Sequence, residues 1–295
     1  MKRVLRGVIF LVVIAIGGPL LFSGILSAAE PAKIVQSGAI LTAAESKRLI
    51  GKAVAQMPIV KNALANGMVI IIKGTTNAYV AEEITGKKAD HAAFVTGRIE
   101  PAKGAKYLPP VKPVNHLILE KGKVVDIPLP DAVKKLKAGD VVMKGANALD
   151  YKNKIAAVNI LDPAGGTTGI TMPFIVARKV HLVIPVGLEK LVAGDVVDLT
   201  LKMREPVESL PAPAGQSGPV FPGYMIPSMW LLTGEIVTEL EAINILTGAT
   251  AFQSSAGGVS GAEGAVWLVF RGTPDQVKKA MELVKSVQGE PPYTQ

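Results

Sequence analysis

Residues 68 to 72, Met-Val-Ile-Ile-Ile, form a continuous apolar run that leads into a turn of glycine and threonine. A short run without polar alternation is typical of a strand that is buried on both faces of a sheet. The turn, Gly74-Thr75-Thr76-Asn77, starts a segment that we expect to be helical and to close at Gly86. A buried strand, a tight turn and a helix are one arm of a parallel sheet, so the sequence predicts an α/β protein.

The same order of elements recurs farther along the chain. Val141 to Met143 is a second apolar run that leads into another turn. A third run, Ile155 to Leu161, precedes a glycine-rich turn, a helix expected from Ile170 and a strand from His181 to Val186. Because strands and helices alternate, we predict a doubly wound, mainly parallel sheet of Rossmann-like kind within residues 30–205.

The C-terminal third of the chain has a different pattern. From Pro206 to Pro227 the chain holds six prolines and three glycines, too many chain breakers for a regular element. We therefore predict that residues 206–227 form a linker or a long surface loop. Residues 228–295 then read as strand, helix, strand, strand, helix, and Thr273 caps the last helix. That order predicts a small C-terminal α+β domain of ferredoxin-like kind.

Local patterns predict smaller details. Thr42 and Glu45 have the spacing of a capping box, so we expect a helix to begin there and to break at Pro58. Lys121-Gly122-Lys123 interrupts an apolar stretch and indicates a hairpin. The glycine-rich segment 257–264 indicates a flexible hairpin loop that could also cover a ligand.

The N-terminus has the order of an export signal. Three basic residues precede an uncharged stretch, Val8 to Leu26, and the small residues Ser27-Ala28-Ala29 follow it. This order is that of a secretory signal, and the stretch is also long enough to span a bilayer. We predict that residues 1–29 are a signal peptide or an N-terminal membrane anchor. The protein is then exported, periplasmic or extracellular, and contacts the membrane only through this segment.

Composition excludes several classes of function. The chain has no cysteine, which rules out disulfide bonds and a cysteine-linked lipid anchor. Its formal charge of +8 becomes +5 without the three basic residues of the signal, because residues 1–29 hold no acid. With few aromatic residues and no arginine-rich stripe, we expect no nucleic-acid partner. His91, His116 and His181 share no metal-ligand spacing, and no dinucleotide or P-loop pattern occurs, so we expect neither metal nor cofactor.

Each glycine-threonine turn is a candidate anion site. Where a buried strand ends and a helix begins, unpaired backbone N–H groups converge and the helix dipole adds partial positive charge. Sheets of this class bind ligands at the carboxyl ends of their strands, so two such turns predict one cleft for a phosphate or carboxylate. The candidate ligand-binding residues are Lys73, Gly74, Thr75, Thr76, Asn77, Lys144, Gly145, Asn147, Asp150, Gly165, Gly166, Thr167 and Thr168.

The order of these motifs along the chain resembles that of the superfamily of ribose-phosphate isomerases, glucosamine-phosphate deaminases and CoA-transferases. The resemblance covers residues 67–187 and rests on the 74–77 turn, on Asp140 to Asp150 and on the glycine-rich turn at 165–169. In the isomerase branch the first turn holds the sugar phosphate, and a strand ends in Asp-Gly-Ala-Asp-Glu-x-Asp. The resemblance therefore implies a fold of this class with an anion pocket.

Departures from the isomerase pattern argue against isomerase activity. Lys144 and Asn147 stand in place of the first two aspartates, Ala148 replaces the glutamate, and Asp150 alone matches. Between the glycine-rich turn and Arg178 no glutamate is present to shuttle a proton. Such a general base commonly contributes a factor of about 10² to 10⁴ in rate. A CoA-transferase needs a nucleophilic glutamate, and the first helix after the turn offers no obvious one.

Three classes of function stay open. The first, which we favour, is an exported protein that binds a small phosphorylated or carboxylated metabolite at helix N-termini. The second is an active isomerase-like or CoA-transferase-like enzyme whose acid or base is Asp150, Asp162 or Glu263. The third is a structural or partner-binding surface protein whose turns only cap helices, with Trp230 and Trp267 supplying contacts. A homo-oligomer is compatible with each class.

Overall fold

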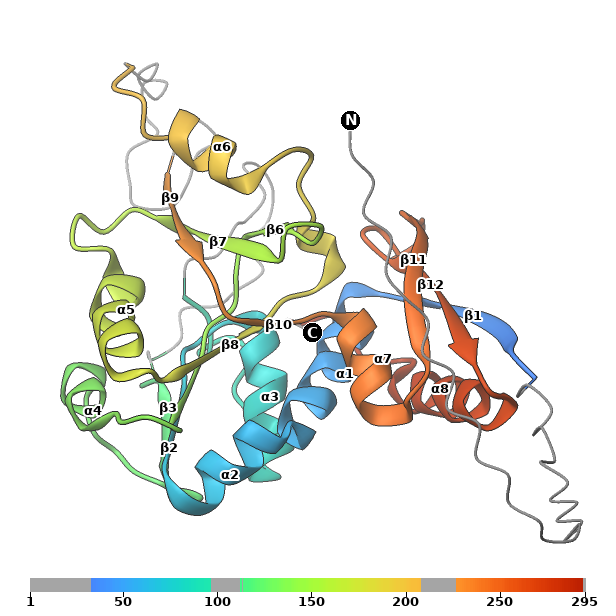
Figure 1. Ribbon diagram of the computed structural model, residues 1–295, viewed down its shortest axis with the longest axis horizontal. Helices are drawn as coiled ribbons and strands as arrows, with labels where there is room; N and C mark the ends of the chain where they lie inside the picture. The colour runs from blue at the N-terminus through green and yellow to red at the C-terminus, as the bar shows by residue number, and fades with distance from the viewer. Residues whose placement is uncertain (1–32, 97–111, 113, 208–226, 294–295) are drawn as a thin grey trace, which may run out of the picture. The chain divides into compact units, whose positions relative to one another are not determined.

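In the computed structural model, one sheet has six strands in the order β10-β8-β5-β2-β3-β4 (Figure 1). Its strands are β2 (Met68–Ile71), β3 (Leu117–Glu120), β4 (Lys123–Val124), β5 (Val141–Met143), β8 (His181–Pro185) and β10 (Glu235–Val237). Strands β2, β5, β8 and β10 are parallel, whereas β3 pairs antiparallel with both β2 and β4. The protein therefore has an α/β fold with a mixed, partly parallel sheet.

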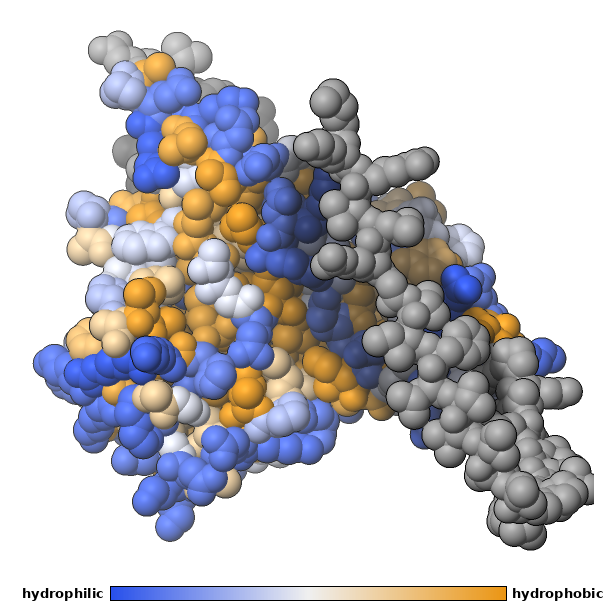
Figure 2. Space-filling model, viewed as in Figure 1, coloured by the Kyte–Doolittle hydropathy of each residue, from blue (hydrophilic) through white to orange (hydrophobic). Residues whose placement is uncertain are grey.

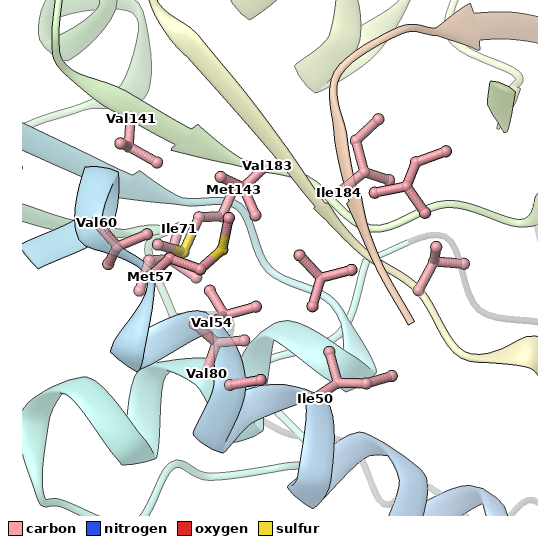
Figure 3. Close-up of a cluster of buried hydrophobic side chains, with 14 of the residues drawn as sticks. Ile50, Val54, Met57, Val60, Ile71, Val80, Val141, Met143, Val183 and Ile184 are labelled. Carbon is pink, nitrogen blue, oxygen red and sulfur yellow. The ribbon is translucent and has the colours of Figure 1, made fainter. Parts of the chain in front are cut away.

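Helices cover both faces of this sheet (Figure 1). They are α1 (Ala43–Gln56), α2 (Pro58–Asn66), α3 (Thr75–Thr85), α4 (Leu129–Lys135) and α5 (Gly166–Arg178). Helix α1 packs on α3, and α4 packs on α5. Figure 3 shows Val54 and Val80 of α1 and α3 near Met143 and Val183 of the sheet. All of these side chains are fully buried, so hydrophobic burial holds this layer together.

The described residues also form two antiparallel sheets of three strands, one of order β6-β7-β9 and one of order β1-β12-β11. Their strands are β1 (Val35–Leu41), β6 (Ala148–Asp150), β7 (Ile155–Ile160), β9 (Ser228–Leu232), β11 (Thr250–Ala256) and β12 (Val266–Gly272). The remaining elements are the 3₁₀ helix η1 (Leu188–Lys190), α6 (Val196–Lys202), α7 (Glu239–Thr247) and α8 (Pro274–Val287). Helices α7 and α8 pack against the β1-β12-β11 sheet.

The structure describes residues 33–96, 112, 114–207 and 227–293. The predicted signal peptide or anchor, residues 1–29, lies outside these ranges, as does nearly all of the proline-rich segment 206–227. Among the described helices, none combines the length and the apolar character that a membrane crossing requires.

The C-terminal residues contribute to all three sheets and do not stand apart as a separate layer. Strand β9 pairs with β7, β10 pairs with β8, and β11 and β12 form a sheet with β1 from the other end of the chain. Residues 33–295 accordingly group in one compact unit. The predicted order of elements is present from β10 to α8, but the first of these strands belongs to the six-stranded sheet. A strand's own sequence does not identify its pairing partner, which is why the sequence predicted the elements and not their sheets.

Local turn and cap predictions are confirmed. Thr42 and Glu45 form the capping box of α1, and the chain breaks at Pro58 between α1 and α2. Gly86 ends α3 in the left-handed conformation, which a residue without a Cβ adopts at little cost. The Lys121-Gly122 turn between β3 and β4 has positive φ at both residues, as a tight type I′ hairpin requires.

Candidate functional site

The carboxyl ends of β2, β5 and β8 border a cavity of about 260 Å³. Because these strands are parallel neighbours, the segments that follow them meet at one edge of the sheet. The cavity brings together the two predicted segments 73–77 and 144–147. Its lining residues are Lys47, Lys73, Gly74, Thr75, Thr76, Asn77, Val95, Thr96, Lys144, Gly145, Ala146, Asn147, Val186, Gly187 and Lys190.

The first turn of α3 lines this cavity. Gly74 is the N-cap residue, and no side chain caps the helix. The first intrahelical bond closes at Ala78, whose N–H donates to the Gly74 carbonyl at 2.9 Å. Ahead of that bond, the N–H groups of Thr75, Thr76 and Asn77 have no intrahelical acceptor, as in the first turn of any α-helix. They are therefore oriented to donate to an anion in the cavity.

Asn77 connects the ends of β2 and β5. Its Nδ2 donates to the Ile72 carbonyl at 2.7 Å and to the Met143 carbonyl at 3.2 Å. The side chain is buried, and its Oδ1 has no hydrogen-bond partner among the described residues. A buried amide oxygen without a donor costs free energy, so a ligand donor that reached it would be stabilising.

Lysines give the cavity its charge. The four that line it are Lys47, Lys73, Lys144 and Lys190. The Lys47 ammonium lies 3.3 Å from Glu189 Oε1, whereas Lys73 Nζ donates to the Val114 carbonyl at 2.8 Å. Burial lowers the pKa of Lys73. Within the described ranges, no carboxylate forms an ion pair with Lys73, Lys144 or Lys190.

Lys144 is buried, as Lys47 is, but its partner is a hydroxyl and not a carboxylate. It is 7% exposed, and its Nζ donates to Thr167 Oγ1 at 2.9 Å. Burial lowers the pKa of Lys144 to about 8, because removal from water disfavours the charged form. His116, which accepts the Lys73 N–H at 3.1 Å, has its pKa lowered to about 4 by burial and then by the charges of Lys73 and Lys144. The surroundings of Lys144 are thus electropositive.

The second predicted turn, residues 165–169, contributes no residue to the lining of this cavity. Gly165 lines a separate cavity of about 670 Å³. Asp162 already occupies the turn, because its Oδ1 accepts the N–H of Ala164 at 2.8 Å and of Gly166 at 3.2 Å. The two glycine turns therefore do not line one cleft, contrary to the expectation from the sequence. Helix α5 also begins at Gly166, earlier than predicted.

The threonines of that turn have separate roles. Thr167 accepts the hydrogen bond from Lys144 and so contacts a residue of the first cavity. Thr168 is buried within the first turn of α5. Only the hydroxyl of Thr167, among the residues described for this turn, forms a hydrogen bond to a side chain that lines the cavity.

Asp150, the acid that matches the isomerase pattern, does not line the cavity. Its Oδ1 accepts the backbone N–H of Asn153 at 3.0 Å, and its Oδ2 accepts from Asn153 Nδ2 at 2.8 Å. These hydrogen bonds lower the pKa of Asp150. Asn147 does line the cavity, and its Oδ1 accepts the N–H of Asn159 at 3.0 Å. Asp150 therefore caps the β6–β7 turn, and Asn147 links the start of β6 to β7.

A buried carboxyl pair lies beside the cavity. Glu239 is fully buried at the start of α7 and accepts the N–H of Leu188 at 2.9 Å. Burial and then the charge of Glu189 raise the pKa of Glu239 to about 7. Glu189 is the partner of the cavity residue Lys47. This pair could not be predicted from the sequence, because nothing in the separate segments shows that they meet.

Lys47, Lys190 and Gly187 were also missed as cavity residues. Lys47 lies in α1 and belongs to no recognisable sequence motif. A signal for the other two did exist, because the apolar strand β8 leads to Gly187 in the same way that β2 leads to Gly74. The rule that the residues after each apolar strand line the site therefore also predicts Gly187 and Lys190.

The three histidines lie in different surroundings. His91 Nε2 is 3.0 Å from Glu82 Oε1, and His181 Nδ1 is 3.0 Å from Glu235 Oε1. In the part of the chain that the structure describes, no three histidine, aspartate or glutamate side chains are grouped so that they could hold a metal ion.

Comparison of the chain with models of protein families, with curated proteins and with solved structures gives no match. The functional conclusion consequently depends on the residues and geometry of the cavity itself.

Proposed function

We propose that the protein binds a small phosphorylated or carboxylated metabolite in the cavity at the carboxyl ends of β2, β5 and β8. One observation carries the proposal: the first turn of α3, which no side chain caps, shares a small cavity with several lysines that form no ion pair in the described residues. An anion there receives backbone N–H donors, the helix dipole and full positive charges. It also neutralises the positive charge of the cavity lysines that form no ion pair among the described residues.

Charges on the outer helices differ from those of the cavity. Figure 2 shows hydrophilic residues over α4 and α6, where Lys134 pairs with Asp131 and Lys202 pairs with Asp198. Such exposed pairs contribute little stability and need no ligand. Lys144 is instead withdrawn from water without a carboxylate partner among the described residues, and that costs free energy which a bound anion offsets. The contrast favours an anion site over a purely structural role for the 74–77 turn.

The proposal is compatible with the sequence-based expectations. A signal peptide at residues 1–29 would place the ligand outside the cytoplasm. The resemblance to sugar-phosphate isomerases and CoA-transferases supports a Rossmann-like interpretation of the parallel strands, with phosphate at the turn after β2. Isomerase activity is not part of the proposal, because the matching acid, Asp150, caps a turn away from the cavity lining.

Substitution of Gly74 tests the site without disturbing the fold. Gly74 has an extended φ of 171°, and an added Cβ would meet no atom of the described residues within 4 Å. Gly74→Val should therefore keep the Tm of the ligand-free protein while it blocks access to the α3 N–H groups. Wild-type protein should gain about 2.7 kcal/mol at a hundredfold excess of ligand over Kd, and the variant close to nothing. Thermal unfolding with inorganic phosphate, glycerol phosphate and citrate measures this difference.

The control is Lys123→Ala, which removes an exposed lysine of β4 outside the cavity and should retain the full response. Equal stabilisation of wild type and Gly74→Val would place the anion elsewhere. If no anion of the set stabilised the wild type, the binding proposal would fail, and a partner-binding surface would become the better account.

A further inference from the structure

Lys144 differs from the other buried lysine of the cavity, Lys47, in the group that holds it. It follows the buried strand β5, and its Nζ donates to the hydroxyl of Thr167 at 2.9 Å. Lys47, in contrast, forms an ion pair with Glu189. Within the described residues, Lys144 therefore has a neutral partner in place of a carboxylate, although it is only 7% exposed.

The groups around Lys144 favour its neutral form. Three other lysines line the same cavity: Lys73 from the β2–α3 segment, Lys190 from η1 and the ion-paired Lys47 from α1. The charge of Lys144 also contributes to the lowered pKa of the uncharged His116. An ammonium that is buried among cations loses its proton more readily than one in water. Burial lowers the pKa of Lys144 to about 8, so a substantial fraction of the amine is neutral near pH 7 to 8. A neutral amine is a nucleophile, and an ammonium is not.

We propose that Lys144 forms a Schiff base with a small aldehyde or ketone that carries a phosphate or carboxylate group. This inference rests on the proposed anion site: the first turn of α3 and Lys73 hold the charged group, and Lys144 meets the carbonyl carbon. The cavity of about 260 Å³ restricts the ligand to a small one. The substrate class thus narrows from small anions to small anionic carbonyl compounds.

The reaction balances without a cofactor. The nitrogen lone pair of Lys144 forms a bond to the carbonyl carbon, the C=O π pair moves to the oxygen, and a proton passes from nitrogen to that oxygen. The hydroxyl then leaves with the second nitrogen proton as water, and a C=N bond remains. Amine and carbonyl compound have become imine and water, with no change in oxidation state. Thr167, which holds the nitrogen beforehand, is a positioning residue.

Reductive trapping of the full chain tests the proposal. Glyoxylate, the smallest aldehyde that carries a carboxylate, is added with cyanoborohydride, which transfers hydride to the C=N carbon and leaves a stable amine. Peptide mapping by mass spectrometry then locates the label. Near pH 7 we expect Lys144 to be labelled at least roughly tenfold faster than the exposed Lys123, because the cavity holds the carboxylate beside Lys144 and the lowered pKa of Lys144 leaves part of its amine neutral. Inorganic phosphate should slow the labelling of Lys144 and leave that of Lys123 unchanged.

Two further readouts separate a nucleophile from a mere cation. Labelling of Lys144 should level off above about pH 8, where the neutral amine is already the main form. Lys144→Arg keeps the positive charge and removes the nucleophile, so phosphate should still raise the Tm while the label at this position disappears. The matched variant Lys123→Arg should retain the label on Lys144.

The outcomes distinguish the two proposals. Labelling of Lys144 that is no faster than that of Lys123, or that phosphate does not slow, would overturn the Schiff base. If phosphate raises the Tm while Lys144 stays unlabelled, the anion site stands and the Schiff base fails. If phosphate leaves the Tm unchanged and glyoxylate labels only exposed lysines, both fail. Mapping of the wild type decides between these results even if Lys144→Arg folds poorly.

Discussion

Glu239 links the protonation of one buried side chain to the stability of the fold. Its pKa is raised to about 7, first by burial and then by the charge of Glu189, whereas an ordinary glutamate has 4.5. The folded state therefore binds this proton more tightly than the unfolded chain. The resulting stabilisation is present below pH 4.5 and is lost as the pH rises through about 7.

We predict that the free energy of unfolding falls across this window by up to about 1.4 kcal/mol per pH unit, and that Glu239→Gln removes this part of the slope. The amide can still accept the Leu188 N–H, so the variant should fold. Urea unfolding at several pH values measures the slope. Glu120→Gln, at an exposed position in β3, should behave as the wild type. Equal slopes in wild type and Glu239→Gln would show that Glu239 does not titrate in this range.

At the residue scale, the sequence predicted the part of the site that follows recognisable apolar runs. Lys144 comes directly after β5 and Lys73 follows β2 after one residue, so their place at the sheet edge follows from parallel pairing. Lys47, Glu189 and Glu239 come from α1, η1 and α7, and their meeting depends on tertiary packing. Contacts between distant segments produce no periodic pattern in the sequence of any one segment.

At the scale of elements, helices with local caps were predictable and strands that depend on distant partners were not. The capping box that starts α1 and the glycine that ends α3 each depend only on residues a few positions apart in the sequence. Strand β1 alternates between partly buried and exposed residues, contains Gly38, and pairs with β12 at the far end of the chain. Its short, small-residue sequence did not stand out as a strand.

The β1–β12 contact gives a prediction for Gly38. An added Cβ would lie 2.9 Å from the Leu268 carbonyl oxygen and 3.2 Å from Trp267 Nε1. We predict that Gly38→Val destabilises the protein by roughly 1–3 kcal/mol, because the neighbouring strand must shift. Chemical denaturation measures the loss. Gln36→Val, an exposed position in the same strand, is the control and should be nearly neutral, so a matching loss there would contradict the clash.

At the scale of the whole molecule, the sheets join the two ends of the described chain. Strand β1 pairs with β12, β7 pairs with β9, and β8 pairs with β10, so residues before and after the 206–227 segment share each sheet. The predicted boundary therefore does not separate two independent sets of contacts, which explains why residues 33–295 group in one unit.

This arrangement predicts a single cooperative unfolding transition. Trp230 lies in β9 and Trp267 in β12, so tryptophan fluorescence reports on the two small sheets, while far-ultraviolet circular dichroism reports mainly on the helices. We expect the two signals to give the same midpoint in a thermal scan. A fluorescence transition well below that of circular dichroism would mean that the C-terminal strands unfold on their own.

The central claim is that the main-chain N–H groups of the first turn of α3 bind an anion. The most direct test follows backbone amide signals by nuclear magnetic resonance while inorganic phosphate is added. The account predicts that the largest shifts fall on Thr75, Thr76 and Asn77, that they saturate, and that Gly74→Val abolishes them. Largest shifts at Gly165 to Thr168, or no saturable shift in the first turn of α3, would contradict it.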